Sequence, residues 1–214
     1  MRIRVGRGIW MLGIGVAVMK AVSAVRSSRG ADELLAEVWP WLVVMAAAGL
    51  HEAGHLIAAW GARARVRGLR VDLFGARMEL SGLLSYGQEF FVAAGGPLVS
   101  LLCAAISYPL MNLWGWEGVG LFCGASLVLG LVNLLPIGTL DGGRMLHCGV
   151  AWFWGEAAAT TVLKGTTAVC LGILWLLSVY GLLRAGQMLS LFVFSLCLLT
   201  RAAGGGEGSV PPAA

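Results

Sequence analysis

Residues 38–60 read Val-Trp-Pro-Trp-Leu-Val-Val-Met-Ala-Ala-Ala-Gly-Leu-His-Glu-Ala-Gly-His-Leu-Ile-Ala-Ala-Trp, an apolar run that nevertheless contains His51, Glu52 and His55. A helix needs about 20 predominantly apolar residues to cross about 30 Å of hydrocarbon. Ionisable side chains within such a helix are costly and usually mark a functional site. The run therefore predicts a membrane helix that carries chemistry.

The composition of the whole chain also indicates a lipid environment. Of its 214 residues, 58% are hydrophobic and only 12% are charged, and the mean hydropathy is +0.84. Soluble domains have about 45–50% apolar and about 25% charged residues. A soluble fold of this size could not bury so much apolar surface.

Further apolar runs extend the prediction to an all-α polytopic membrane protein with about six transmembrane helices. Besides residues 38–60, these runs cover residues 9–25, 90–113, 118–135, 162–183 and 188–200. We expect a single integral-membrane domain over residues 1–203, with its catalytic core at about 38–145. Residues 204–214 are rich in Gly, Pro and Ala and are expected to be a disordered tail.

Between the second and third apolar runs, the sequence changes to the pattern of a strand. From Arg65 to Leu73, polar and apolar residues largely alternate, which is the period of a half-buried β-strand. Glycines at 75, 82 and 87 then mark turns. We expect a small β-hairpin region at the membrane surface.

The basic residues predict the orientation of the chain. Arginines cluster in the segment after the second run, at positions 63, 65, 67, 70 and 77. Loops rich in Lys and Arg usually face the cytoplasm, so we expect a cell-membrane protein with both termini cytoplasmic. The clusters flank apolar runs and do not form a basic face with interleaved aromatic residues, so the expected partners are the lipid bilayer and a protein substrate rather than nucleic acid.

The sequence His51-Glu52-Ala53-Gly54-His55 is an HExxH motif. Residues four apart share one face of a helix, so both imidazoles can reach one zinc ion. Glu52 can then accept a proton from the attacking water. A structural alternative is a polar helix face that hydrogen-bonds to neighbouring helices.

A catalytic zinc ion takes three protein ligands and keeps one position open. Asp141 is the expected third ligand, because it lies in the sequence Asn133-Leu-Leu-Pro-Ile-Gly-Thr-Leu-Asp141-Gly-Gly at the end of an apolar run. Pro136 ends the helix there. Irregular backbone at membrane depth is tolerated only where protein buries it or where it lines a water-filled cavity, which suits hydrolysis in a membrane. By itself, the stretch is equally typical of a turn capped by Asp141.

Together, HExxH and N-x-x-P-x-x-x-L-D-G resemble the site-2 protease family of intramembrane zinc metalloproteases, and most closely its stage IV sporulation protein FB branch. Residues 89–98, Glu-Phe-Phe-Val-Ala-Ala-Gly-Gly-Pro-Leu, are similar to a third motif of that branch, with Gly95 in place of alanine.

The resemblance implies that His51, His55 and Asp141 bind zinc and that Glu52 is the catalytic base. Asn133 would orient the substrate or stabilise the oxyanion. In that branch, the substrate is a sporulation sigma-factor precursor.

Two alternatives concern the same polar residues and their neighbours. A membrane transporter or metal-handling protein could also use intramembrane carboxylates and broken helices for ion binding; Glu52 argues against it, because a pure binding site does not need that residue. His147 and Cys148 could be a fourth ligand or a Cys-His pair, but adjacent residues diverge by about 100° on a helix, so packing is expected.

Overall fold

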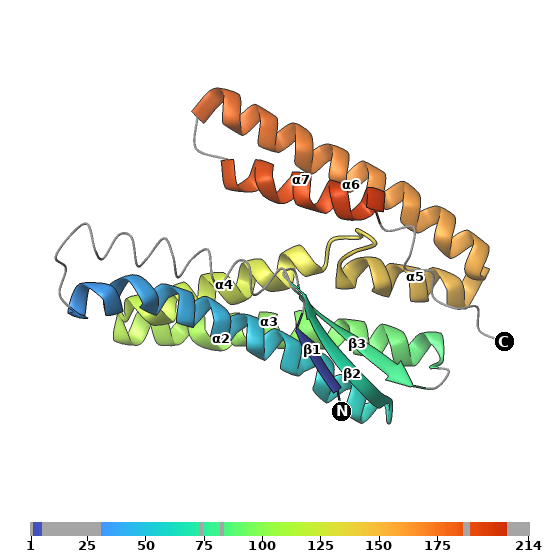
Figure 1. Ribbon diagram of the computed structural model, residues 1–214, viewed down its shortest axis with the longest axis horizontal. Helices are drawn as coiled ribbons and strands as arrows, with labels where there is room; N and C mark the ends of the chain where they lie inside the picture. The colour runs from blue at the N-terminus through green and yellow to red at the C-terminus, as the bar shows by residue number, and fades with distance from the viewer. Residues whose placement is uncertain (1, 6–30, 73–74, 82–83, 186–188, 205–214) are drawn as a thin grey trace.

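The computed structural model describes residues 2–5, 31–72, 75–81, 84–185 and 189–204. Within these residues the helices are α2 (Ala31–Gly61), α3 (Tyr86–Trp114), α4 (Glu117–Asn133), α5 (Asp141–Trp154), α6 (Glu156–Ala185) and α7 (Leu189–Gly204). The strands are β1 (Arg2–Val5), β2 (Arg65–Asp72) and β3 (Gly75–Ser81). Figure 1 shows α6 and α7 as a layer above α5, with α2 and α3 below it.

In the described part of the chain, three helices are long and apolar enough to cross a membrane: Val38–Gly61, Tyr86–Leu113 and Glu156–Arg184. The predicted runs at 118–135 and 188–200 correspond to shorter apolar helices, Glu117–Asn133 and Leu191–Thr200. The predicted run at 9–25 lies outside the described residues, and so does the predicted tail at 204–214 except for Gly204, which is the last residue of α7. The number of six membrane crossings therefore stays a prediction.

The ends of α3 follow from local chemistry. Ser85 is its N-cap: the Ser85 hydroxyl accepts the backbone N–H of Gln88, and the Gln88 side chain accepts the backbone N–H of Ser85. This reciprocal capping box satisfies two N–H groups that a helix end otherwise leaves without partners. At the other end, Gly115 has a φ of 62°, a left-handed conformation that favours glycine.

Helix α3 is central to the bundle, because it packs against α2, α4 and α5. It crosses α2 at Gly54 and Gly95. A Cβ on either glycine would collide with the backbone carbonyl oxygen of the other. Small residues allow helix backbones to approach in this way within membranes. The glycine at 95, where the resembling motif has alanine, thus brings α3 directly onto the helix that carries HExxH.

The chain leaves α4 at Asn133 and re-enters a helix at Asp141, with Pro136 in the connecting loop. Ile137 anchors this loop, since its side chain is fully buried against Leu171 of α6 and Leu198 of α7. Gly142 and Gly143 lie against the loop so closely that a Cβ on either would collide with the carbonyl of Leu134 or Ile137. Helix α5 itself was not predicted from the sequence.

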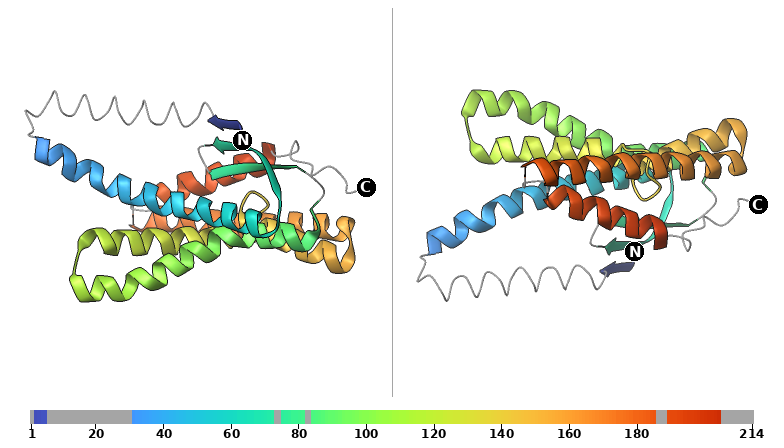
Figure 2. Two further views of the ribbon diagram at one scale, coloured as in Figure 1. Left: turned by 90° about the horizontal axis from the view of Figure 1, so that it is seen from below. Right: turned by 90° about the horizontal axis from the view of Figure 1, so that it is seen from above.

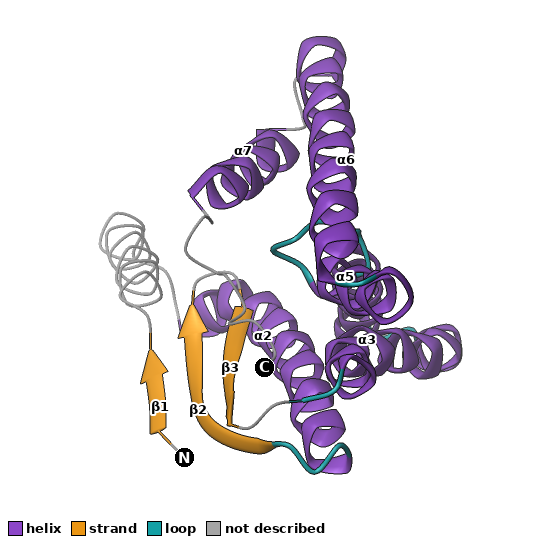
Figure 3. Cartoon of the chain, turned by 90° about the vertical axis from the view of Figure 1, so that its right-hand side faces the viewer, coloured by secondary structure: helices purple, strands orange, loops and turns teal. Residues whose placement is uncertain are grey.

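The segment after α2 contains two antiparallel strands, with Arg65 opposite Ser81 and Asp72 opposite Gly75. The link at 73–74 lies outside the described residues, so the structure describes the pairing of β2 with β3 and not the turn of the predicted hairpin. Strand β1 pairs in parallel with the other edge of β2, which was not expected. Figures 2 and 3 show this sheet beside α2, on the side away from α3.

Candidate metal centre

The structure brings together the three residues that the sequence analysis proposed as ligands. His51 Nε2 and His55 Nε2 each lie 3.2 Å from Asp141 Oδ2, and the two imidazole nitrogens are 3.3 Å apart. The histidines come from adjacent turns of α2 and the aspartate from the first turn of α5. Residues separated by about 90 positions in the chain (Asp141 and His51) thus meet at one point.

These spacings can be compared with those of a metal site. Zinc binds imidazole nitrogen and carboxylate oxygen at about 2.0–2.2 Å in a tetrahedral arrangement, whose edges are then about 3.3–3.6 Å long. The three atoms here form a nearly equilateral triangle with sides of 3.2–3.3 Å. Within the described residues, they form a group that could hold a metal ion.

The hydrogen bonds of His55 Nδ1 determine which nitrogen of the ring carries the proton. His55 Nδ1 lies 2.8 Å from the backbone carbonyl oxygen of Val92 on α3. A carbonyl can only accept, so Nδ1 carries the proton. The N–H of Gly96 lies farther away, 3.3 Å from the same nitrogen, and is the weaker contact. In the neutral ring, Nε2 is therefore the lone-pair nitrogen, as a metal ligand requires.

The approach of His55 Nε2 to the Asp141 carboxylate has an electrostatic consequence. Both atoms are acceptors when the imidazole is neutral. Their 3.2 Å separation is unfavourable unless a cation, either a proton or a metal ion, lies between them. The site is well protected from solvent, with His51 and His55 only 4% and 5% exposed. A divalent cation that is attracted by the carboxylate fits this donor set.

Gly96 provides the space in front of the two imidazoles. A Cβ at this position would lie within 3 Å of the Nε2 atoms of both His51 and His55. The missing side chain therefore leaves room beside the atoms that would coordinate a metal. The sequence analysis included Gly96 in a motif but did not assign it a role in the site.

For the other two predicted catalytic residues, Glu52 and Asn133, the structure gives the position but not the role. Glu52 is half-buried on α2, adjacent to His51. Asn133 is the last residue of α4, and its side-chain N–H donates to the Leu129 carbonyl of the same helix, at 3.0 Å. The roles of Glu52 and Asn133 stay predictions.

His147 and Cys148 lie apart from the metal group and have other partners. His147 Nε2 is 3.1 Å from Glu156 Oε1, which joins α5 to the start of α6. The buried Cys148 thiol lies 3.6 Å from the Glu89 carboxylate. Burial, together with the Glu89 charge, raises the pKa of the Cys148 thiol to about 12. A thiol with this pKa stays protonated near neutral pH and is a poor nucleophile.

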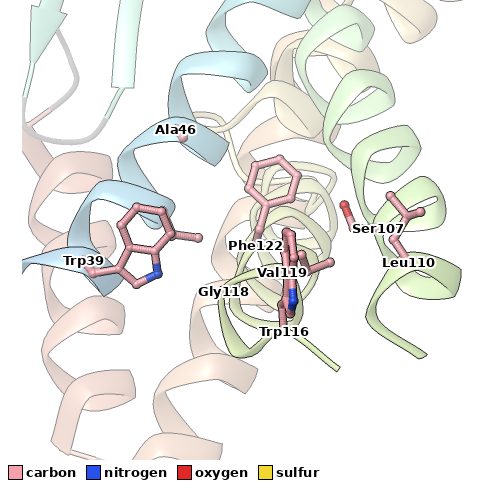
Figure 4. A pocket seen from close by; sticks show the side chains of 9 residues that line it. Trp39, Ala46, Ser107, Leu110, Trp116, Gly118, Val119 and Phe122 are labelled. Atoms are coloured by element: carbon pink, nitrogen blue, oxygen red, sulfur yellow. The ribbon is translucent and has the colours of Figure 1, made fainter. Parts of the chain in front are cut away.

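An apolar cavity of about 470 Å³ lies between α2, α3 and α4. Figure 4 shows Trp39, Trp116 and Phe122 around it, with the Ser107 hydroxyl on the α3 side. None of the metal group lines this cavity. Chemistry in this chain is therefore expected at the triangle of ligand atoms and not in the cavity.

Comparisons with known proteins relate the chain to putative zinc metalloproteases. No family model matches the chain. The chain is 30% identical over 210 residues to "Putative zinc metalloprotease Rip3" of Mycobacterium tuberculosis, covering 94% of this chain and 43% of that protein. It is also 33% identical over 119 residues to a Synechocystis protein of the same description, sll0528, covering 52% of this chain and 31% of the relative. The chain thus spans less than half the length of these relatives.

A solved structure shows the fold. The Site-2 Protease from Methanocaldococcus jannaschii superimposes with a TM-score of 0.65 at 19% identity, covering 94% of this chain and 89% of that one. The chain therefore has the fold of a site-2 protease. The fold that the resemblance to the site-2 protease family implied is thus confirmed. No sporulation protein is among the matches given above.

Proposed function

We propose that this chain is a zinc metalloendopeptidase of the site-2 type, which cleaves a protein substrate within or beside a membrane. The observation that carries the proposal is the convergence of His51, His55 and Asp141, with ligand atoms 3.2–3.3 Å apart. The fold of a site-2 protease and the names of the relatives support it. The predicted cofactor, Zn²⁺, agrees with those names and with the donor set.

In this proposal the protein side chains have distinct tasks. His51, His55 and Asp141 would hold zinc, which supplies Lewis-acid chemistry by polarising a carbonyl and activating water. Glu52 accepts a proton from the attacking water as its oxygen bonds to the scissile carbonyl carbon. The same proton then passes to the leaving amine as the C–N bond breaks. The Asn133 amide is proposed to donate to the carbonyl oxygen as its charge develops.

The substrate must present an extended backbone, because a membrane helix has its carbonyl groups internally bonded. In the described sheet, β2 has a partner on both sides, whereas β3 pairs with β2 alone. The other edge of β3 can accept an added strand. We propose that an unwound substrate segment pairs with this edge. A sporulation sigma-factor precursor stays a motif-based prediction for the substrate.

Cleavage by purified protein tests the activity. Glu52→Gln keeps the size of the side chain but removes the base, so zinc content should stay near wild type while cleavage of a membrane-protein substrate falls by about 10²–10⁴-fold. Glu117→Gln, an exposed Glu in the first turn of α4, is the matched control and should cleave normally.

Two results would contradict the proposal. Wild-type cleavage by Glu52→Gln would remove Glu52 from the chemistry. Metal transport into vesicles by a wild-type protein that cleaves no substrate would favour the transporter alternative.

A further inference from the structure

We infer that Ser100 is a positioning residue for the metal centre: its hydroxyl holds the proton of His51 on Nδ1 and so turns the Nε2 lone pair toward the metal. The inference rests on the proposed function, because it concerns how a proposed ligand is prepared. Ser100 is not part of the motifs in the sequence, and it lies 49 positions from His51.

The contact itself is short and buried. His51 Nδ1 lies 2.9 Å from Ser100 Oγ. Ser100 is 1% exposed and His51 is 4% exposed. Water is thus largely excluded from this contact, and the Ser100 hydroxyl is the hydrogen-bonding group that the structure places at Nδ1.

The two histidines differ in the hydrogen-bond partners of their Nδ1 atoms. His55 Nδ1 donates to the backbone carbonyl of Val92, an acceptor that no side-chain substitution removes. The His51 ring instead faces a hydroxyl, which can either donate or accept. The geometry alone allows both tautomers of His51. Metal binding through Nε2 requires the tautomer with the proton on Nδ1, and in that state Ser100 Oγ accepts.

The position of Ser100 on α3 is consistent with this role. Ser100 follows Gly96 by one helical turn, and residues four apart lie on the same face. Gly96 faces the Nε2 atoms of the two histidines, while Ser100 reaches the rear of one of them. Both residues therefore lie on the face of α3 that packs against HExxH. Outer partners of this kind usually contribute about 10–100-fold to metal affinity.

Zinc affinity, measured by chelator competition on the purified full chain, tests the inference. Ser100→Ala should weaken zinc binding by about 10–100-fold, and Ser100→Thr, which keeps the hydroxyl, should restore most of the loss. Ser126→Ala is the matched control. Ser126 is also 1% exposed, and its Oγ has no hydrogen-bond partner within the described residues. Its loss should leave zinc affinity within about threefold of wild type.

Thermal unfolding of the metal-free proteins separates positioning from packing. A positioning role predicts that metal-free Ser100→Ala unfolds close to wild type although its zinc affinity is reduced. The inference is overturned if Ser100→Ala binds zinc like wild type, or if Ser126→Ala loses as much zinc affinity as Ser100→Ala. It is also overturned if metal-free Ser100→Ala loses as much free energy of unfolding as it loses in zinc-binding free energy. A wild-type chain that does not bind zinc would overturn the proposed function as well, whereas the other outcomes leave it intact.

Discussion

Replacing Gly96 with alanine is the sharpest test of the space in front of the two histidines. In a helix interior, Gly→Ala ordinarily stabilises a protein by about 0.5–1 kcal/mol. Here the added Cβ would lie within 3 Å of His51 Nε2 and His55 Nε2. Either the imidazoles must turn away from Asp141 or α3 must move away from α2. The substitution should therefore oppose metal binding.

The magnitude follows from the cost of overpacking. Forcing a methyl group into a well-packed site costs about 1–3 kcal/mol. If this cost acts only on the metal-bound arrangement, zinc affinity falls by about 5–150-fold, since each 1.4 kcal/mol is a factor of ten. Chelator competition measures the affinity, and elemental analysis measures the zinc that remains after purification.

Gly49→Ala is the matched control for this prediction. Gly49 lies on α2, and a Cβ there meets nothing within 4 Å. It should leave zinc affinity unchanged and raise the melting temperature slightly. Wild-type zinc affinity in Gly96→Ala would refute the idea that Gly96 provides space for the metal, because a Cβ would then fit beside both ligand atoms.

Three further predictions concern the third ligand, the orientation and the sheet. Asp141→Ala should lose most of the bound zinc, because it removes the carboxylate from the three-ligand group; full zinc content in this variant would exclude Asp141 as a ligand. A single cysteine at position 65, in a variant without its native cysteines, should be labelled from the cytoplasmic side; labelling from outside intact cells would invert the proposed orientation. Proline substitutions along Gly75–Ser81 should slow cleavage but spare zinc binding at positions whose N–H faces the free edge of β3; normal cleavage by every folded variant would exclude strand addition at β3.

The sequence predicted best those elements that have a long apolar run or a motif with helical spacing. Apolar length predicted the membrane-length stretches of α2, α3 and α6, with ends that differ by at most six residues. The four-residue spacing of His51 and His55 predicted that they share a face. Helix α5 was missed because it is short and starts at Asp141-Gly142-Gly143, a sequence that is also typical of a turn. Strand β1 was missed because it has only four residues and its partner strand, β2, lies far away in the sequence.

The contacts of α3 with the two histidines were missed for a different reason. Ser100, the Val92 carbonyl and Gly96 reach the histidines because α3 crosses α2 at Gly54 and Gly95. Sequence spacing gives the positions along each helix, but it does not give the point at which two helices cross. A pair of small residues on each helix is the signal for such a crossing, and many small residues in this chain could have supplied it.

This crossing also helps to bring together ligands that come from two different helices. Helix α2 supplies both histidines and α5 supplies Asp141, and α3 packs against both of these helices. The carboxylate is held at the first turn of α5, where the helix dipole favours negative charge, and the preceding loop is anchored by the fully buried Ile137. Helix α3 therefore links the two helices that supply the ligands. Its small residues Gly95 and Gly96 allow it to lie close to α2, at the point where the two histidines face α3.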